Sequence, residues 1–110
     1  VVYTGTHDNV TTEGWRATAS PEDVHYACRY LRCTPKDLTE AMIAACLSCV
    51  SDMAIIPMAD WLHLGAEARI NTPSTQGSNW QWRLTTPLTS LLADHIADLT
   101  VLYDRATAAE

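Results

Sequence analysis

The chain has 110 residues, of which 47% are hydrophobic and 18% are charged, a composition that suits one globular domain and excludes a disordered chain. The net charge of -6 argues against a nucleic-acid-binding protein, because such proteins need a basic face to hold phosphates. No apolar run is long enough to span a bilayer, and the first residues do not resemble a secretory leader. We therefore expect no nucleic-acid partner and no membrane partner.

The first feature in chain order is a short strand at residues 1–4 that leads into a polar loop. The β-branched and aromatic side chains at its start are typical of a strand, and the loop that follows contains His7, Asp8 and Asn9. In a barrel of parallel strands, reacting groups lie at such C-terminal tips. These three side chains could together contact one sugar-sized ligand. The alternative is a turn in which Asp8 and Asn9 bond only to the backbone.

Three helices are predicted from Ser/Thr-Pro pairs. Ser20, Thr34 and Thr86 each place a capping oxygen before a proline at the first helical position. The second of these helices is apolar all round, which indicates that it is covered on both sides. The third has a strong 3.6-residue apolar period, within which we interpret His95 as a helix-face residue rather than a ligand. The helices are expected at about residues 21–32, 35–51 and 87–108.

A second strand is predicted at residues 53–57, where the wholly apolar sequence is typical of a parallel strand buried on both faces. The order of strand, helices, strand and helix gives two successive βα units of an α/β architecture. Because two strands alone make no stable parallel sheet, we interpret residues 1–110 as a single segment of a larger barrel. The uncovered strand edges and the apolar helix predict that the isolated chain self-associates.

A second polar cluster follows the strand at residues 53–57. Amide and guanidinium groups can bond sugar hydroxyls, and an indole face can pack on the C–H side of a sugar ring. Asn71 is interpreted as a binding residue, because it lies in a polar loop just beyond a strand tip. The structural alternative is that Glu67 pairs with Arg69 while Trp80 and Trp82 fill the core. For Glu67 and Trp82 we favour that alternative.

The chain has four cysteines, and two of them form a Cys46-x-x-Cys49 motif that could suggest a metal or redox pair. The motif lies in an apolar run interpreted as a buried helix, where Cys commonly acts as a small core residue. A zinc site would need two further ligands at suitable spacing, and no His pair matches. We predict no metal and no cofactor, keep a metal or thiol module as the weakest alternative, and expect the free thiols to lie in the reducing cytoplasm.

Several of these segments resemble the 4-α-glucanotransferases known as amylomaltases or disproportionating enzymes, glycoside hydrolase family 77. The match keeps its order nearly from end to end. The resemblance implies an α/β fold: the segment is the C-terminal portion of a (β/α)8 TIM barrel, its last two βα units, mostly helical with two short parallel strands. The matching motifs are Tyr3-Thr4-Gly5-Thr6-His7-Asp8-Asn9, Gly14-Trp15, Leu64-Gly65, Glu67-Ala68-Arg69, Asn71-Thr72-Pro73, Asn79-Trp80 and Trp82-Arg83.

Such enzymes cut an α-1,4-glucan with retention and transfer the glucanosyl group to another sugar, so the resemblance implies maltooligosaccharide partners. Asp8 resembles the carboxylate that stabilises the transition state, and His7, Asn9 and Asn71 resemble substrate-binding residues. The family's nucleophilic Asp and acid/base Glu match nothing in this chain and lie upstream of Val1. The isolated chain is therefore expected to be inactive. The alternative function is a free-standing carbohydrate-binding or interaction module derived from the same barrel.

Overall fold

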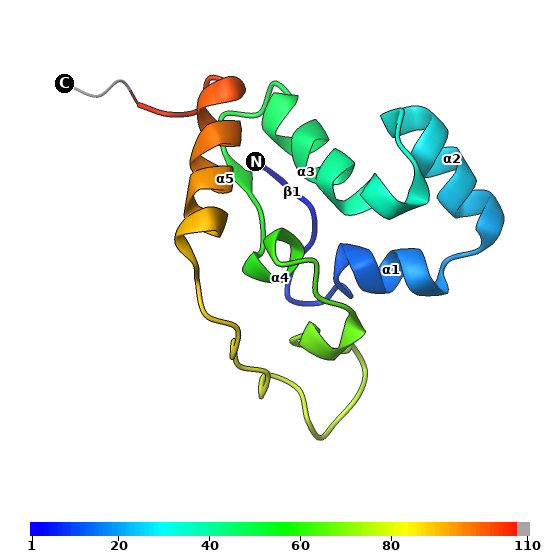
Figure 1. Cartoon of the computed structure of the whole chain (residues 1–110). Helices are drawn as coiled ribbons and strands as arrows, with labels where there is room; N and C mark the ends of the chain where they lie inside the picture. The colour runs from blue at the N-terminus through cyan, green and yellow to red at the C-terminus, as the bar shows by residue number, and fades with distance from the viewer. Residues whose placement is uncertain (108–110) are drawn as a thin grey trace.

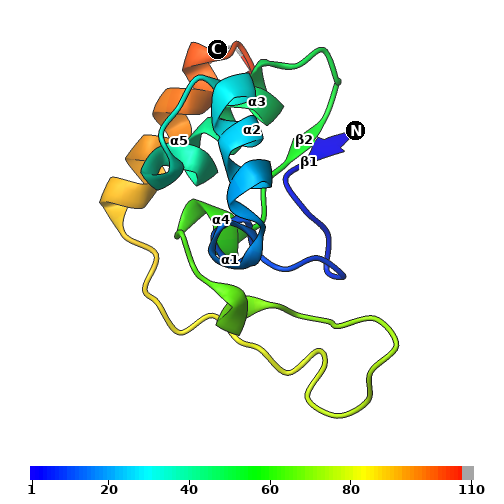
Figure 2. The ribbon, with the colours of Figure 1, turned by 90° about the vertical axis from the view of Figure 1, so that its right-hand side faces the viewer.

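The strands β1 (Val2–Tyr3) and β2 (Ala54–Ile55) lie side by side and parallel in the computed structural model, which describes residues 1–107 (Figure 2). Both are shorter than the expected ranges 1–4 and 53–57, because Gly5 begins a loop and Pro57 caps a helix. Within the described residues the strands pair only with each other. Because no further strand in residues 1–107 pairs with β2, alternate side chains along β2 and the residue before it are exposed, and Met53 is one of them. This corrects the expectation of a strand buried on both faces.

The helix α3 (Leu38–Ser48) lies at the centre of the structure. It packs against α1 (Thr12–Thr18) and α2 (Pro21–Leu31) on one side and against α5 (Ser90–Leu102) on the other, as Figure 1 shows. The short helix α4 (Met58–Trp61) also contacts it. The apolar surface all round α3 therefore packs against several neighbouring helices at once.

Three predicted helix boundaries, at residues 35, 51 and 87, are wrong, and the second of the predicted helices ends at Ser48 rather than at residue 51. The range 35–51 divides into a 3-10 turn, η1 (Pro35–Asp37), and α3, because the Thr34 hydroxyl bonds the Asp37 carboxylate (2.9 Å) rather than capping the backbone. The last helix begins at Ser90 instead of residue 87, since Thr89 supplies the cap. It ends at Leu102, and residue 108 of the expected range lies outside the described residues.

The helix α1 was not predicted from the sequence. Its N-cap is Thr11, whose hydroxyl accepts a hydrogen bond from the backbone N–H of Gly14 at 3.1 Å. Gly14 is needed because a Cβ there would lie 2.5 Å from the Val10 side chain and 3.1 Å from the backbone nitrogen of Ala66. The close approach lets α1 pack on a second 3-10 turn, η2 (Ala66–Ala68). Glycine has a low helix propensity, so a seven-residue helix that contains one is not predicted from its sequence pattern.

Glu13 joins α1 to α3. Its carboxylate accepts hydrogen bonds from Arg16 at 2.6 Å and from the Thr39 hydroxyl at 2.8 Å. Burial alone would raise the pKa of Glu13, but these two hydrogen bonds together hold the pKa below its ordinary value. The ionised carboxylate is thus the form that connects the two helices.

The hydrophobic core forms where α3, α4 and α5 meet. Ile43, Leu47 and Trp61 are its buried centre. Part of the predicted apolar stripe of α5 packs on them, whereas Leu91 and Leu102 face outward. The half-buried contributors from the flanking elements are Ala54, Ile56, Met58, Leu92, Ile96, Leu99 and Tyr103. No helix among the described residues has the length and apolar character needed to cross a membrane.

Between η2 and α5, residues 69–89 form a long loop without a helix or strand, which swings away from the helices in Figures 1 and 2. The beginning of this loop returns to the segment after β1, because the backbone N–H of Asn71 donates to the carbonyl of His7 at 3.0 Å. The polar segments that follow the two strands therefore lie next to each other, as expected for the C-terminal ends of parallel strands.

Candidate functional site

A buried carboxylate holds the two strand ends together. Asp60, in α4 after β2, is 3% exposed. It accepts hydrogen bonds from the Thr4 hydroxyl at 2.5 Å, from the Thr12 backbone N–H at 2.9 Å and from the Thr12 hydroxyl at 3.1 Å. Since Thr4 and Thr12 lie at the two ends of the loop after β1, these bonds fix both ends of the loop that carries His7 and Asp8.

The structure brings together three of the four predicted site residues. One carboxylate oxygen of Asp8 accepts a hydrogen bond from the Asn71 side-chain amide at 2.7 Å, and the other lies 3.2 Å from Nε2 of His7. About half of each of the Asp8 and His7 side chains is exposed. The Asp8 carboxylate is thus oriented by the protein while it keeps a face toward solvent, where it can accept hydrogen bonds from hydroxyl groups.

Arg69 positions the backbone of this cluster, a role that the sequence interpretation missed. Its guanidinium donates to the Asp8 carbonyl at 2.7 Å and to the Asn71 carbonyl at 2.9 Å, which connects the two loops. The expected pairing of Arg69 with Glu67 does not occur. The Glu67 carboxylate instead accepts a hydrogen bond from the backbone N–H of Gly65 at 3.0 Å. The only signal for Arg69 in the sequence was its place in the Glu67-Ala68-Arg69 motif.

Trp80 lies against His7 rather than in the core. The two ring centroids are 4.8 Å apart with an interplanar angle of 35°, and Trp80 is 56% exposed. Its backbone has a positive φ of 65° and donates to the Ile70 carbonyl at 2.7 Å, which turns the indole back toward the site. Trp82 is half-buried and lines a cavity beside Asp60, but it is not among the residues of the hydrophobic core.

Asn9 is turned away from the cluster. Its side-chain oxygen accepts hydrogen bonds from the backbone N–H of Thr6 at 2.8 Å and from the Thr6 hydroxyl at 3.0 Å. This is the backbone-bonded turn that was the alternative interpretation of the loop, and it applies to Asn9 but not to the Asp8 carboxylate. Asn9 therefore shapes the loop that presents its two neighbours.

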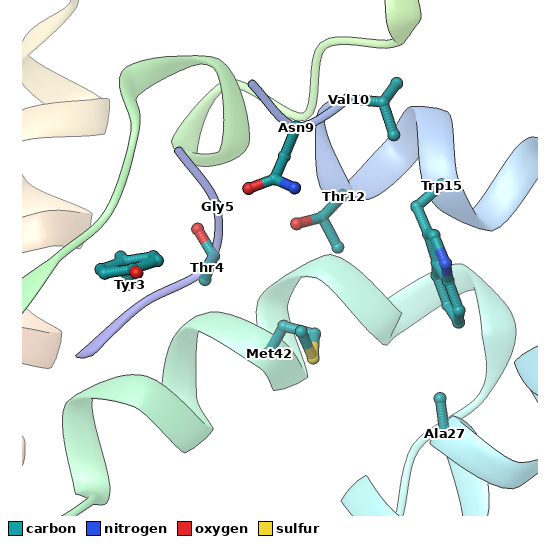
Figure 3. A pocket seen from close by; sticks show the side chains of 9 residues that line it. All are labelled: Tyr3, Thr4, Gly5, Asn9, Val10, Thr12, Trp15, Ala27 and Met42. Carbon is teal, nitrogen blue, oxygen red and sulfur yellow. The ribbon is translucent and has the colours of Figure 1, made fainter. Parts of the chain in front are cut away.

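Figure 3 shows the cavity on the inner side of this loop, into which Asn9 projects. The cavity measures about 370 Å³, and its wall is mostly apolar, with Met42 of α3 and Trp15 of α1 among the lining residues. His7, Asp8 and Asn71 do not line it. The exposed polar cluster and the cavity are thus separate features, and only the cluster has the chemistry to bond hydroxyls. Across residues 1–107, no group of three or more His, Cys, Asp or Glu side chains is placed to hold a metal ion.

Comparison with known proteins identifies the family. A family model described as 4-alpha-glucanotransferase matches residues 1–89, which include both loops of the polar cluster. The chain belongs to the 4-alpha-glucanotransferase family. This confirms the family to which the motifs around His7, Asp8 and Asn71 pointed.

Individual relatives are described as 4-alpha-glucanotransferases or amylomaltases as well. The chain is 43% identical to the chloroplastic/amyloplastic 4-alpha-glucanotransferase of Arabidopsis thaliana, covering 96% of this chain and 19% of that protein. It is 44% identical to the 4-alpha-glucanotransferase of Clostridium butyricum, covering 96% of this chain and 22% of that protein. A solved amylomaltase from Streptococcus agalactiae, in complex with acarbose, has 34% identity and a TM-score of 0.89 over 97% of this chain and 22% of the other. The chain thus spans about a fifth of the length of these relatives and corresponds to a segment of a larger enzyme.

Proposed function

We propose that this segment is the C-terminal part of a 4-α-glucanotransferase and comprises the last two βα units of its (β/α)8 barrel. The observation that supports this most directly is the half-exposed Asp8 carboxylate, held by Asn71 and His7 beside the ends of two parallel strands. The substrate class is an α-1,4-glucan or maltooligosaccharide. Its hydroxyls can donate to Asp8, while the ring can pack on Trp80.

In this proposal, the reaction proceeds with retention of configuration. Retention requires a nucleophilic carboxylate and a second carboxyl group that acts as acid and then as base, and both belong to parts of the enzyme outside this segment. Asp8 supplies the third carboxylate. Its hydrogen bonds to the sugar hydroxyls strengthen as positive charge develops on the ring, so that it stabilises the transition state more than the bound substrate. Arg69 is a positioning residue, since it bonds the backbone on both sides of the cluster.

The first test is an activity assay on maltotriose. We expect the purified chain to produce neither glucose nor longer maltooligosaccharides, because one stabilising carboxylate cannot break the glycosidic bond. In the complete enzyme, Asp8→Asn keeps the size of the side chain but removes its charge, and it should lower kcat by about 100-fold or more. The matched control is Asp52→Asn, which changes an exposed carboxylate after α3 and should leave kcat unaltered. Turnover by the isolated chain that disappears in Asp8→Asn would contradict the proposal.

A second candidate function is a carbohydrate-binding module, and the exposed Trp80 indole against His7 favours it. An indole face next to hydrogen-bonding side chains can hold a sugar without any catalysis. Titration calorimetry with maltoheptaose decides between binding and no binding. Saturable heat that is lost in Trp80→Ala supports the module, whereas a flat titration removes it and leaves the assignment to the enzyme unchanged.

A further inference from the structure

The two cysteines of the Cys46-x-x-Cys49 motif have different environments at the end of α3. Cys46 lies inside the helix and is 8% exposed, whereas Cys49 is the first residue after the helix and is partly exposed. Burial, together with the nearby Cys49, raises the pKa of Cys46. The backbone N–H and hydroxyl of Ser51 lower the pKa of Cys49. The motif therefore combines an accessible, more acidic thiol with a buried, less acidic one.

The surroundings of Cys49 favour a negatively charged sulfur. The C-terminal end of a helix disfavours a thiolate by itself, because the terminal carbonyls point outward. Arg105 binds one terminal carbonyl of the helix and two carbonyls just beyond it: its guanidinium donates to the carbonyls of Leu47 at 2.7 Å, Cys49 at 3.1 Å and Ser51 at 2.9 Å. The arginine also places a positive charge beside Cys49. A cavity of about 440 Å³ gives a small molecule room to approach; its charged lining residues are Arg105 and the carboxylates of Asp52 and Asp104, and Cys49 and Ser51 line it as well.

The backbone places the Cβ atoms of Cys46 and Cys49 on the same side of α3. They are three positions apart, and Cys49 has a φ of -77°, close to the helical value, so that its Cβ continues the helical face of Cys46. Such neighbours have Cβ atoms about 5–6 Å apart, and a disulfide needs about 3.5–4.5 Å. A shift of about 1–2 Å at the helix end closes the pair. Cys49 lies just past the last helical residue, and the hydrogen bond that its carbonyl accepts from Arg105 at 3.1 Å has to adjust for such a shift.

We propose that Cys49 is a thiol-modification site for low-molecular-weight disulfides of the glutathione type, with Cys46 as the resolving thiol. In the first step the Cys49 thiolate attacks one sulfur of the disulfide, a mixed disulfide forms, and the other half leaves as a thiol after taking a proton. In the second step the Cys46 sulfur loses its proton to water and attacks the Cys49 sulfur, which releases the second thiol. Two protein thiols are oxidised, and one external disulfide is reduced to two thiols.

The reactivity of Cys49 is tested by alkylation of the full chain with iodoacetamide over a range of pH, followed by peptide mass spectrometry. The pH midpoint of Cys49 alkylation should be lower than that of Cys33. The pKa of Cys33 is raised by burial and by the neighbouring Cys28. Ser51→Ala should move the pH midpoint of Cys49 alkylation upward and leave the midpoint of Cys33 unchanged. Equal midpoints for Cys49 and Cys33, or a midpoint of Cys49 that Ser51→Ala does not move, would overturn the first half of the proposal.

The resolving step is tested with glutathione disulfide. The native chain should gain one glutathionyl group on Cys49 and then lose it, ending two hydrogen masses lighter with Cys46 and Cys49 joined. Cys46→Ser should retain the adduct, and Cys46→Ala serves as a second variant because it keeps a small apolar side chain in the buried position. Cys33→Ser should behave like the native chain. An adduct that persists on Cys49 of the native chain shows that Cys46 does not resolve it, and an adduct that forms first on Cys33 contradicts the assigned site.

Discussion

At the scale of single residues, Asp60 determines how the site is held. It is a buried carboxylate whose three hydrogen-bond donors are two threonine hydroxyls and one backbone N–H. A buried charge is tolerated only when its oxygens are satisfied in this way. The same donors would lose their acceptor if the carboxylate were removed. Asp60 therefore links the stability of the chain to the position of the loop that carries Asp8.

Asp60→Ala should lower the free energy of unfolding by about 3 kcal/mol, because it leaves the buried hydroxyl and backbone N–H of Thr12 and the half-buried hydroxyl of Thr4 without an acceptor. Urea denaturation followed by circular dichroism measures this change. Asp52→Ala is the matched control, since Asp52 is exposed in the loop after α3 and should change stability by less than about 0.5 kcal/mol. If the two variants were equally stable, the hydrogen bonds of Asp60 would contribute no more than surface contacts.

At the scale of secondary-structure elements, the start of α5 shows which of two nearby threonines, Thr86 or Thr89, caps the helix. The Thr89 hydroxyl accepts from the backbone N–H of Leu92 at 3.2 Å, whereas Thr86, which precedes a proline, lies in the loop before the helix. Thr89→Ala should therefore destabilise the chain by about 1 kcal/mol, and Thr86→Ala should have almost no effect. Thermal unfolding of both variants measures the difference. A larger loss for Thr86→Ala than for Thr89→Ala would place the helix start where the sequence alone suggested.

The elements that the sequence predicted well are those fixed by short-range contacts. Helix α2 begins at Pro21 because Ser20 caps it locally, with its hydroxyl 3.1 Å from the backbone nitrogen of Asp23. The cluster of His7, Asp8 and Asn71 is not of this kind, since Asn71 is 63 positions from Asp8, and only the family resemblance indicated it. The role of Arg69 was not predicted, because its contact with the Asp8 carbonyl is equally long-range and the resemblance implied no role for it. The orientation of Asn9 also depended on a loop conformation that its motif does not encode.

At the scale of the whole molecule, the described residues leave one large apolar surface open. Tyr26 and Tyr30 project from α2 at 73% and 79% exposure, beside a groove of about 420 Å³ between β1, α2 and α3. Met42 and Cys46 of α3 line the same groove. Since the segment corresponds to about a fifth of its relatives' length, it presents surface that a chain of this size cannot bury by itself.

We expect the isolated chain to self-associate through this surface, and light scattering over a range of concentrations measures it. The apparent mass should rise with concentration, and it should rise further with added salt, because salt screens the repulsion between copies that each carry a net charge of -6. Tyr30→Lys places a charge in the apolar surface and should shift the chain toward the monomer. Arg29→Lys keeps the charge at the neighbouring exposed position of α2 and should not. A monomer at every concentration, or equal association by the two variants, would contradict an apolar interface at α2 and would mean that the two tyrosines tolerate water in the isolated chain.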